Sequence, residues 1–204
     1  LQAASLSGTI LDRSSLEKAS LVGATLIGAS FTNSNLHGAN LQNANLHEAN
    51  LQEANLGKAD LQGANLEKAN LLNANLESAN LQGANLVGSV LQGAKVDGAI
   101  LQGANLQGAN LLSAKPRETN LNGDNLERAK LEGANLGKAD LEGTNLERVI
   151  LQGANLQGAN LKRANLNEAN LVGAHLVQAD LEKANLTKAN LTKANLEGVS
   201  LVGA

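Results

Sequence analysis

Residues 151–160 read LQGANLQGAN, two identical pentapeptides in tandem, and this period of five runs through the whole chain. From Leu1 to Leu201, every fifth residue is Leu at 38 of 41 positions, and the exceptions are Phe31, Val96 and Pro116. A lone helix needs apolar spacings of three and four, and a strand needs alternation, so a period of five fits neither. Five residues can instead form one short extended segment and a corner. A chain that turns the same way at every corner becomes a solenoid.

The residues around each leucine support this interpretation. Two positions before the leucine, Ala occupies 32 of 41 sites, which indicates an inward slot that accepts only small side chains. One position before it, Asn or Asp occupies 26 of 40 sites, and these side chains bond nearby backbone in turns. We assign this turn role to Asn40, Asn65, Asn105 and Asn155. The predicted core includes Phe31, Leu41, Leu61, Leu81, Leu101, Leu136 and Leu156.

The second position after the leucine is expected to form the corner. Gly stands there at 19 sites and suits a turn that needs a positive φ. The other residues at this position, often Lys or Arg, are expected to need a different corner geometry.

The tandem Ala-Asn-Leu-x-x units, such as those beginning at Ala39 and Ala154, resemble the pentapeptide-repeat family over essentially the whole chain. The resemblance implies an all-β fold, a right-handed quadrilateral β-helix with four pentapeptides in each coil. A coil would then contain about 20 residues, and about ten coils would stack at ~4.8 Å into a rod roughly 45–50 Å long. We expect one domain over residues 1–204, since no linker composition separates a second one.

The composition argues against catalysis. The chain has one Phe and no Trp, Tyr, Met or Cys, so thiol chemistry is excluded, and its net charge is only −3. His37, His47 and His175 do not stand at the spacing of a metal site. No Ser-His-Asp arrangement, phosphate loop or paired-carboxylate cleft is apparent. We therefore predict no catalytic residue, no metal and no cofactor.

The sequence also limits the classes of partner. No apolar run approaches the ~20 residues that span a bilayer. A nucleic-acid binder should show a basic stripe or aromatic stacking platforms, and the sequence shows neither. We predict a protein partner, no nucleic acid and no membrane, with a cytoplasmic location favoured but no compartment fixed. Neither end of the sequence shows a cap, so we expect capping by other segments or end-to-end self-association.

The most irregular stretch runs from about residue 89 to residue 130. Here Lys95 and Lys115 replace Asn, Pro116 replaces the core leucine, and Asp124 occupies an alanine slot. Proline has no N–H and a buried carboxylate needs a partner, so an outward bulge would relieve both problems. Two interpretations stay open, a tolerated defect or junction and a partner-binding patch. The candidate patch consists of Lys95, Asp97, Lys115, Arg117, Glu118 and Asp124.

Two functional hypotheses follow. The first is a rigid, non-enzymatic scaffold that presents its surface to another protein, as solenoids do generally. The second comes from a family branch associated with quinolone resistance, whose members look like B-form DNA and bind DNA gyrase. Mimicry of DNA needs stripes of acidic residues, whereas acidic and basic residues alternate in this sequence, as in Glu67-Lys68 and Glu182-Lys183. That branch also favours more Phe in its core, so the scaffold hypothesis ranks first.

Overall fold

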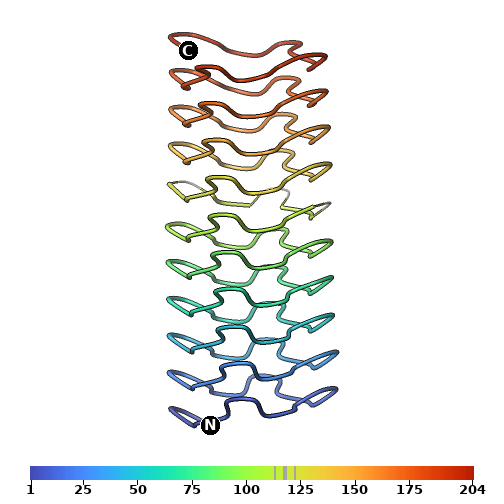
Figure 1. Ribbon diagram of the computed structural model, residues 1–204, viewed down its shortest axis with the longest axis vertical. Coiled ribbons are helices and arrows are strands. Elements are labelled where there is room, and N and C mark those ends of the chain that lie inside the picture. The colour runs from blue at the N-terminus through green and yellow to red at the C-terminus, as the bar shows by residue number, and fades with distance from the viewer. Residues whose placement is uncertain (113, 117–118, 122) are drawn as a thin grey trace.

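The protein winds into a tall stack of similar coils in a computed structural model, with the two termini at opposite ends (Figure 1). The structure describes residues 1–112, 114–116, 119–121 and 123–204. Parallel β-bridges join residues 20 positions apart, as in Asn45 with Asn65 and Asn145 with Asn165. Such bridges recur every five residues, so each coil contains four pentapeptides and four bridge columns. The expected 20-residue coil is therefore present.

The secondary structure consists of isolated bridges and turns. Over the described ranges there is no helix, and no strand is longer than one bridge residue. The reason is the length of the repeat, because two of its five residues form the corner and one pairs with the neighbouring coils. No helix of the described chain could cross a membrane.

Backbone hydrogen bonds between coils hold the stack together. The N–H of Leu41 donates to the carbonyl of Asp60 in the next coil at 2.7 Å. The N–H of Asn40 donates to the carbonyl of Ala19 in the preceding coil at 2.9 Å. In most described pentapeptides, the N–H two residues after the leucine also donates to the next coil. A typical pentapeptide thus contributes three donors to the ladder, which leaves few backbone groups unpaired.

The corners share one geometry whether or not they contain Gly, which corrects the expectation from the sequence. Gly103 has a φ of 74°, but Lys68 at the equivalent position has a φ of 56°. A non-Gly residue pays a steric cost of ~1 kcal/mol in this left-handed region. Two bonds offset it at Lys68: its own N–H donates to Val87 at 2.9 Å, and the N–H of Ala69 closes the turn onto Leu66 at 3.0 Å.

The Asn side chains satisfy a fourth N–H and also connect the coils. The Oδ1 of Asn65 accepts from the N–H of Glu67 at 3.2 Å and from the Nδ2 of Asn85 at 3.1 Å. Its Nδ2 donates to the Oδ1 of Asn45 at 3.2 Å. The same bond to the N–H two residues ahead is made by Asn40 at 3.0 Å, Asn105 at 3.2 Å and Asn155 at 3.1 Å.

The core is a continuous column of Leu and Ala inside the coils. The side chains assigned to it from the sequence are at most 1% exposed: Phe31, Leu41, Leu61, Leu81, Leu101, Leu136 and Leu156. Pro116 and Asp124 are buried as well, so neither residue moves outward as expected. The neighbouring bridges, Lys95 with Lys115 and Ile100 with Asn120, keep the 20-residue register through this stretch.

Replacing Leu156 with Asp should unfold the coils around it. Leu156 is fully buried, and the variant loses that apolar burial while placing a carboxylate in a column with no partner for it. We expect the free energy of unfolding to fall by more than about 4 kcal/mol, measured by thermal and urea denaturation. Gln152→Asp, at an exposed corner of the same coil, is the control and should change stability little. Equal melting curves for wild type and Leu156→Asp would contradict the buried position.

Two variants in the Asn columns should change the stability of the protein in opposite directions. Asn65→Ala removes an acceptor and a donor, which should lower the free energy of unfolding by about 1–2 kcal/mol. Val90 interrupts a column between Asn70 and Asn110, so Val90→Asn should raise stability by up to about 1 kcal/mol. Urea denaturation measures both. If the Asn65→Ala variant were more stable than wild type, the Asn column would not stabilise the fold.

Candidate functional site

A filled interior leaves chemistry to the outer surface, and one strip of that surface differs from the rest. We define the polar strip as the side and corner formed by Lys95, Lys115, Asn135, Lys138, Asn155, Gln157 and Gln178. Its first four coils are in register, because Lys95, Lys115, Asn135 and Asn155 occupy the same position of successive coils. The bridges Lys95 with Lys115 and Asn135 with Asn155 show two of these three steps. At the step between them, the N–H of Asn135 donates to the carbonyl of Ala114 at 3.1 Å.

The two stacked lysines change the local bonding. Both are exposed and stand where Asn normally accepts the N–H two residues ahead, a bond that an ammonium group cannot make. Neither Lys95 nor Lys115 forms an ion pair with any described residue. Lys115 also offers no amide oxygen to Asn135, so the Asn column begins again at that residue. The strip therefore carries positive charge that its described neighbours do not neutralise.

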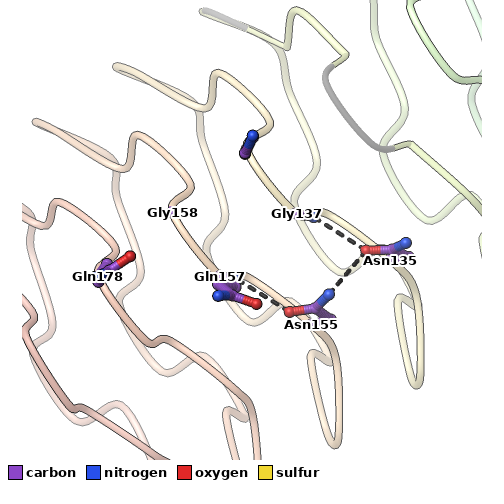
Figure 2. A pocket seen from close by; sticks show the side chains of 7 residues that line it. Asn135, Gly137, Asn155, Gln157, Gly158 and Gln178 are labelled. Atoms are coloured by element: carbon purple, nitrogen blue, oxygen red, sulfur yellow. Dashed lines mark hydrogen bonds between the residues drawn. The ribbon is translucent and has the colours of Figure 1, made fainter.

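A hollow of about 270 Å³ lies above this point of the strip (Figure 2). It exists because Gly137 and Gly158, at two adjacent corner positions, have no side chains. Lys138, Gln157 and Gln178 surround it, and the amides of Asn135 and Asn155 line its inner side. The described residues that line it include one cation, Lys138, and no carboxylate.

Hydrogen bonds fix the inner side of the hollow. The Nδ2 of Asn155 donates to the Oδ1 of Asn135 at 3.0 Å. The N–H groups of Gly137 and Gln157 donate to the Oδ1 atoms of Asn135 and Asn155, at 3.2 and 3.1 Å. Figure 2 shows these bonds along one edge of the hollow. These backbone donors are thus occupied, and the side chains around the opening remain for a ligand.

The structure divides the patch predicted from the sequence. Lys95 and Lys115 lie together, and the half-buried Asp97 follows Lys95 at the next corner. Asp124 is 1% exposed and lies in the core, so it does not belong to a surface patch. Arg117 and Glu118 fall outside the described residues. The hollow was missed, although the sequence contains a signal for it, since Gly directly follows the core leucine only at Gly57 and Gly137.

The repeat pattern matches a known family. The family model for pentapeptide repeats matches residues 1–38, 29–67, 54–93, 84–123, 125–163 and 164–203. The chain is a pentapeptide-repeat protein. No curated protein sequence is significantly similar to it.

Solved structures of other pentapeptide-repeat proteins are similar to this one. HetL, involved in heterocyst differentiation regulation in the cyanobacterium Nostoc sp. strain PCC 7120, is 34% identical. The alignment covers 98% of this chain and 90% of HetL, with a TM-score of 0.58. QnrB1, a plasmid-mediated fluoroquinolone resistance protein, is 20% identical over 97% of this chain and 92% of its own, also with a TM-score of 0.58. At that identity the second likeness shows the fold alone.

Away from the strip, basic and acidic side chains on the surface of this pentapeptide-repeat protein form ion pairs with one another. Arg148 Nε lies 2.9 Å from Glu168 Oε2, and Lys162 Nζ lies 3.1 Å from Asp180 Oδ2. These contacts hold the pKa of Glu168 below its ordinary value, and the pKa of Lys162 above its own. Within the described ranges, no three His, Asp or Glu side chains gather as a metal ion would require.

Asp124 is a buried carboxyl group that the core satisfies only in part. Its Oδ1 accepts from the N–H of Ala104 at 3.1 Å, and its buried Oδ2 has no hydrogen-bond partner. Burial raises its pKa to about 8, although the N–H groups of Ala104 and Gly103 favour the carboxylate. Two other polar residues in alanine slots are better satisfied, since Thr119 and Thr144 donate to core carbonyls at 2.9 and 2.7 Å.

Asp124 should make the stability of the protein depend on pH. Its pKa is about 8 when folded and near 3.8 when unfolded, so the folded state holds the proton more tightly. Its contribution to the free energy of unfolding is therefore fully present below pH 4 and is lost as the pH rises to about 8. Asp124→Asn removes this titration, and Asp124→Ala, which restores the repeat, should be more stable than wild type at pH 8 by on the order of a few kcal/mol.

Urea denaturation of wild type and both variants at pH 5 and pH 8 measures this effect. The difference in unfolding free energy between Asp124→Ala and wild type should be larger at pH 8. A difference that stays the same, or that shrinks at pH 8, would show that Asp124 is ionised at little cost.

Proposed function

We propose that this chain is a non-enzymatic scaffold that presents the outer surface of a rigid solenoid to a protein partner. The observation that carries this proposal is the interior, which is filled from Leu21 to Ala184 mainly by Leu and Ala side chains. The few polar side chains inside it, such as Asp124 and Thr144, are buried out of reach of a substrate. The polar chemistry of the molecule is on its corners and sides.

The proposal includes the finer geometry implied by the family. We infer a right-handed quadrilateral β-helix that forms a single domain over residues 1–204. The four bridge columns per coil support the quadrilateral cross-section, and the 20-residue register that continues on both sides of Pro116 supports a single domain. Backbone bonds between successive coils make the surface stiff, so a partner meets side chains at fixed spacings of ~4.8 Å. End-to-end self-association through the terminal coils remains part of the proposal.

Several observations support a protein as the partner. HetL, similar over nearly the whole chain, is involved in the regulation of a differentiation process. The strip carries three lysines without described counter-charges, and the chain has no Trp or Tyr on which bases could stack. The alternative, a DNA mimic that binds DNA gyrase, would need a continuous acidic surface. Mixed ion pairs such as Arg148 with Glu168 count against that alternative.

Cross-linking from defined corners tests the scaffold proposal. A photoreactive amino acid placed at single corner positions of two coils would be irradiated in extracts of the source organism. The positions are Gln82, Val87, Gln92, Asp97, Glu142, Glu147, Gln152 and Gln157. We expect the same protein adduct from one or two neighbouring corners and none from the opposite corner. Adducts that are equal on all corners, or absent from all of them, would contradict a specific partner surface.

A gyrase assay tests the alternative, a DNA mimic that binds DNA gyrase. Titration of this protein into a DNA supercoiling reaction should leave gyrase activity unchanged. Dose-dependent inhibition that is altered by charge reversal at Glu77 and Asp97 would establish the mimic instead.

A further inference from the structure

We propose that the hollow at Gly137 and Gly158 binds a carboxylate of an acidic peptide segment, which lies along the polar strip. This inference deepens the proposed scaffold function, on which it rests, by naming the chemistry of the partner. It extends over the coils from Lys95 to Gln178 and uses only side chains that face outward there.

The charge of the strip is the first argument. Lys95, Lys115 and Lys138 are exposed, and none forms an ion pair with a described residue. Some lysines elsewhere on the molecule are paired, since Lys162 and Lys188 lie 3.1 and 3.5 Å from carboxylate oxygens. Among the described residues of the strip, the one acid is the half-buried Asp97, at its lower end. A partner that contributes carboxylates would supply the missing counter-charges.

The donors around the hollow are the second argument. The Nδ2 of Asn135 lacks the acceptor that an Asn one coil below would provide, because Lys115 stands there. The amides of Gln157 and Gln178 make no side-chain hydrogen bond with the described residues. Together with the ammonium group of Lys138, these amides can donate to both oxygens of one carboxylate. Charge-assisted bonds of this kind are stronger than neutral ones.

An internal repeat shows that the hollow depends on its neighbours rather than on the local sequence. Residues 54–61 and 134–141 both read ANLGKADL. At Gly57 the ring of His37 lies 3.3 Å from the position that a Cβ would take. At Gly137 the nearest described atoms are the side-chain amides of Asn135 and Asn155 and the carbonyl of Gln157, and no ring approaches among the described residues. Arg117, which stands one coil below Gly137 as His37 does below Gly57, falls outside the described residues.

The coils above these two places also differ. One coil above Gly57 the corner residue is Glu77, whereas above Gly137 it is Gln157. The coil above Lys58 therefore offers a carboxylate that the coil above Lys138 lacks, and Glu118, one coil below Lys138, falls outside the described residues. Lys58 is a matched control for Lys138, because it has the same flanking sequence and register while the ring of His37 lies against its glycine.

A fluorescence anisotropy titration tests this site in the purified, full-length protein. The probe is fluorescein-labelled hexaglutamate, with labelled hexaglutamine and a labelled thymidine hexanucleotide as comparisons. The variants are Lys138→Gln and Gly137→Gln, with Lys58→Gln as the control. Gly137 has no left-handed φ, and Gln157 occupies the same corner position one coil above, so the fold should accept the Gln. Circular dichroism melting checks each variant.

We expect hexaglutamate to bind and hexaglutamine not to bind. Lys138→Gln and Gly137→Gln should each weaken hexaglutamate binding roughly fivefold, and Lys58→Gln should change it less than about twofold. No binding of hexaglutamate, equal effects of Lys138→Gln and Lys58→Gln, or tighter binding of the thymidine oligonucleotide would overturn the proposal.

The two proposals can fail separately. If corner cross-linking captures a partner while hexaglutamate does not bind, the carboxylate site is wrong and the scaffold function stands. If no corner gives a specific adduct, the scaffold function is wrong whatever the peptide titration shows.

Discussion

The hydrogen-bond ladder between successive coils is the constraint on which the rest of the structure depends. Along most of the described chain, the N–H of the core leucine donates to the coil above, and the N–H before it donates to the coil below. This arrangement fixes the 20-residue period, and with it the vertical alignment of side chains. It also holds residues such as Lys68 in a left-handed corner that their own preferences disfavour. At most corners an Asn side chain accepts a hydrogen bond from the remaining backbone N–H, and the Asn columns also add bonds between coils.

The same constraint explains where the molecule can and cannot do chemistry. A coil of four pentapeptides encloses mainly leucines and alanines, so the described interior offers no polar group except at irregular slots. Asp124 shows the cost of such a slot, because one of its oxygens has no partner and burial raises its pKa to about 8. Binding must therefore use the outside, where each coil places one side chain above another. Three lysines and a hollow on one strip give the surface its most specific chemistry.

The irregular stretch shows which features the repeat pattern predicts and which it does not. The sequence located the anomalies correctly, since Lys95, Lys115, Pro116 and Asp124 all depart from the repeat. Their proposed grouping was wrong for Asp124, which the solenoid keeps inside because its alanine slot faces the core. The hollow at Gly137 was overlooked because a missing side chain matters only when the residues above and below leave the space open. The identical octapeptide at Gly57 does not leave it open.

The sequence by itself determined the period, the core and the turn role of Asn65 and its equivalents. A strict repeat makes these local properties, since each pentapeptide meets the same neighbours. Only the tertiary structure decided which residues from different coils share a surface and how the non-Gly corners fold. It also decided that Pro116 and Asp124 stay buried. These features depend on contacts between residues about twenty positions apart, and the composition of one repeat does not specify them.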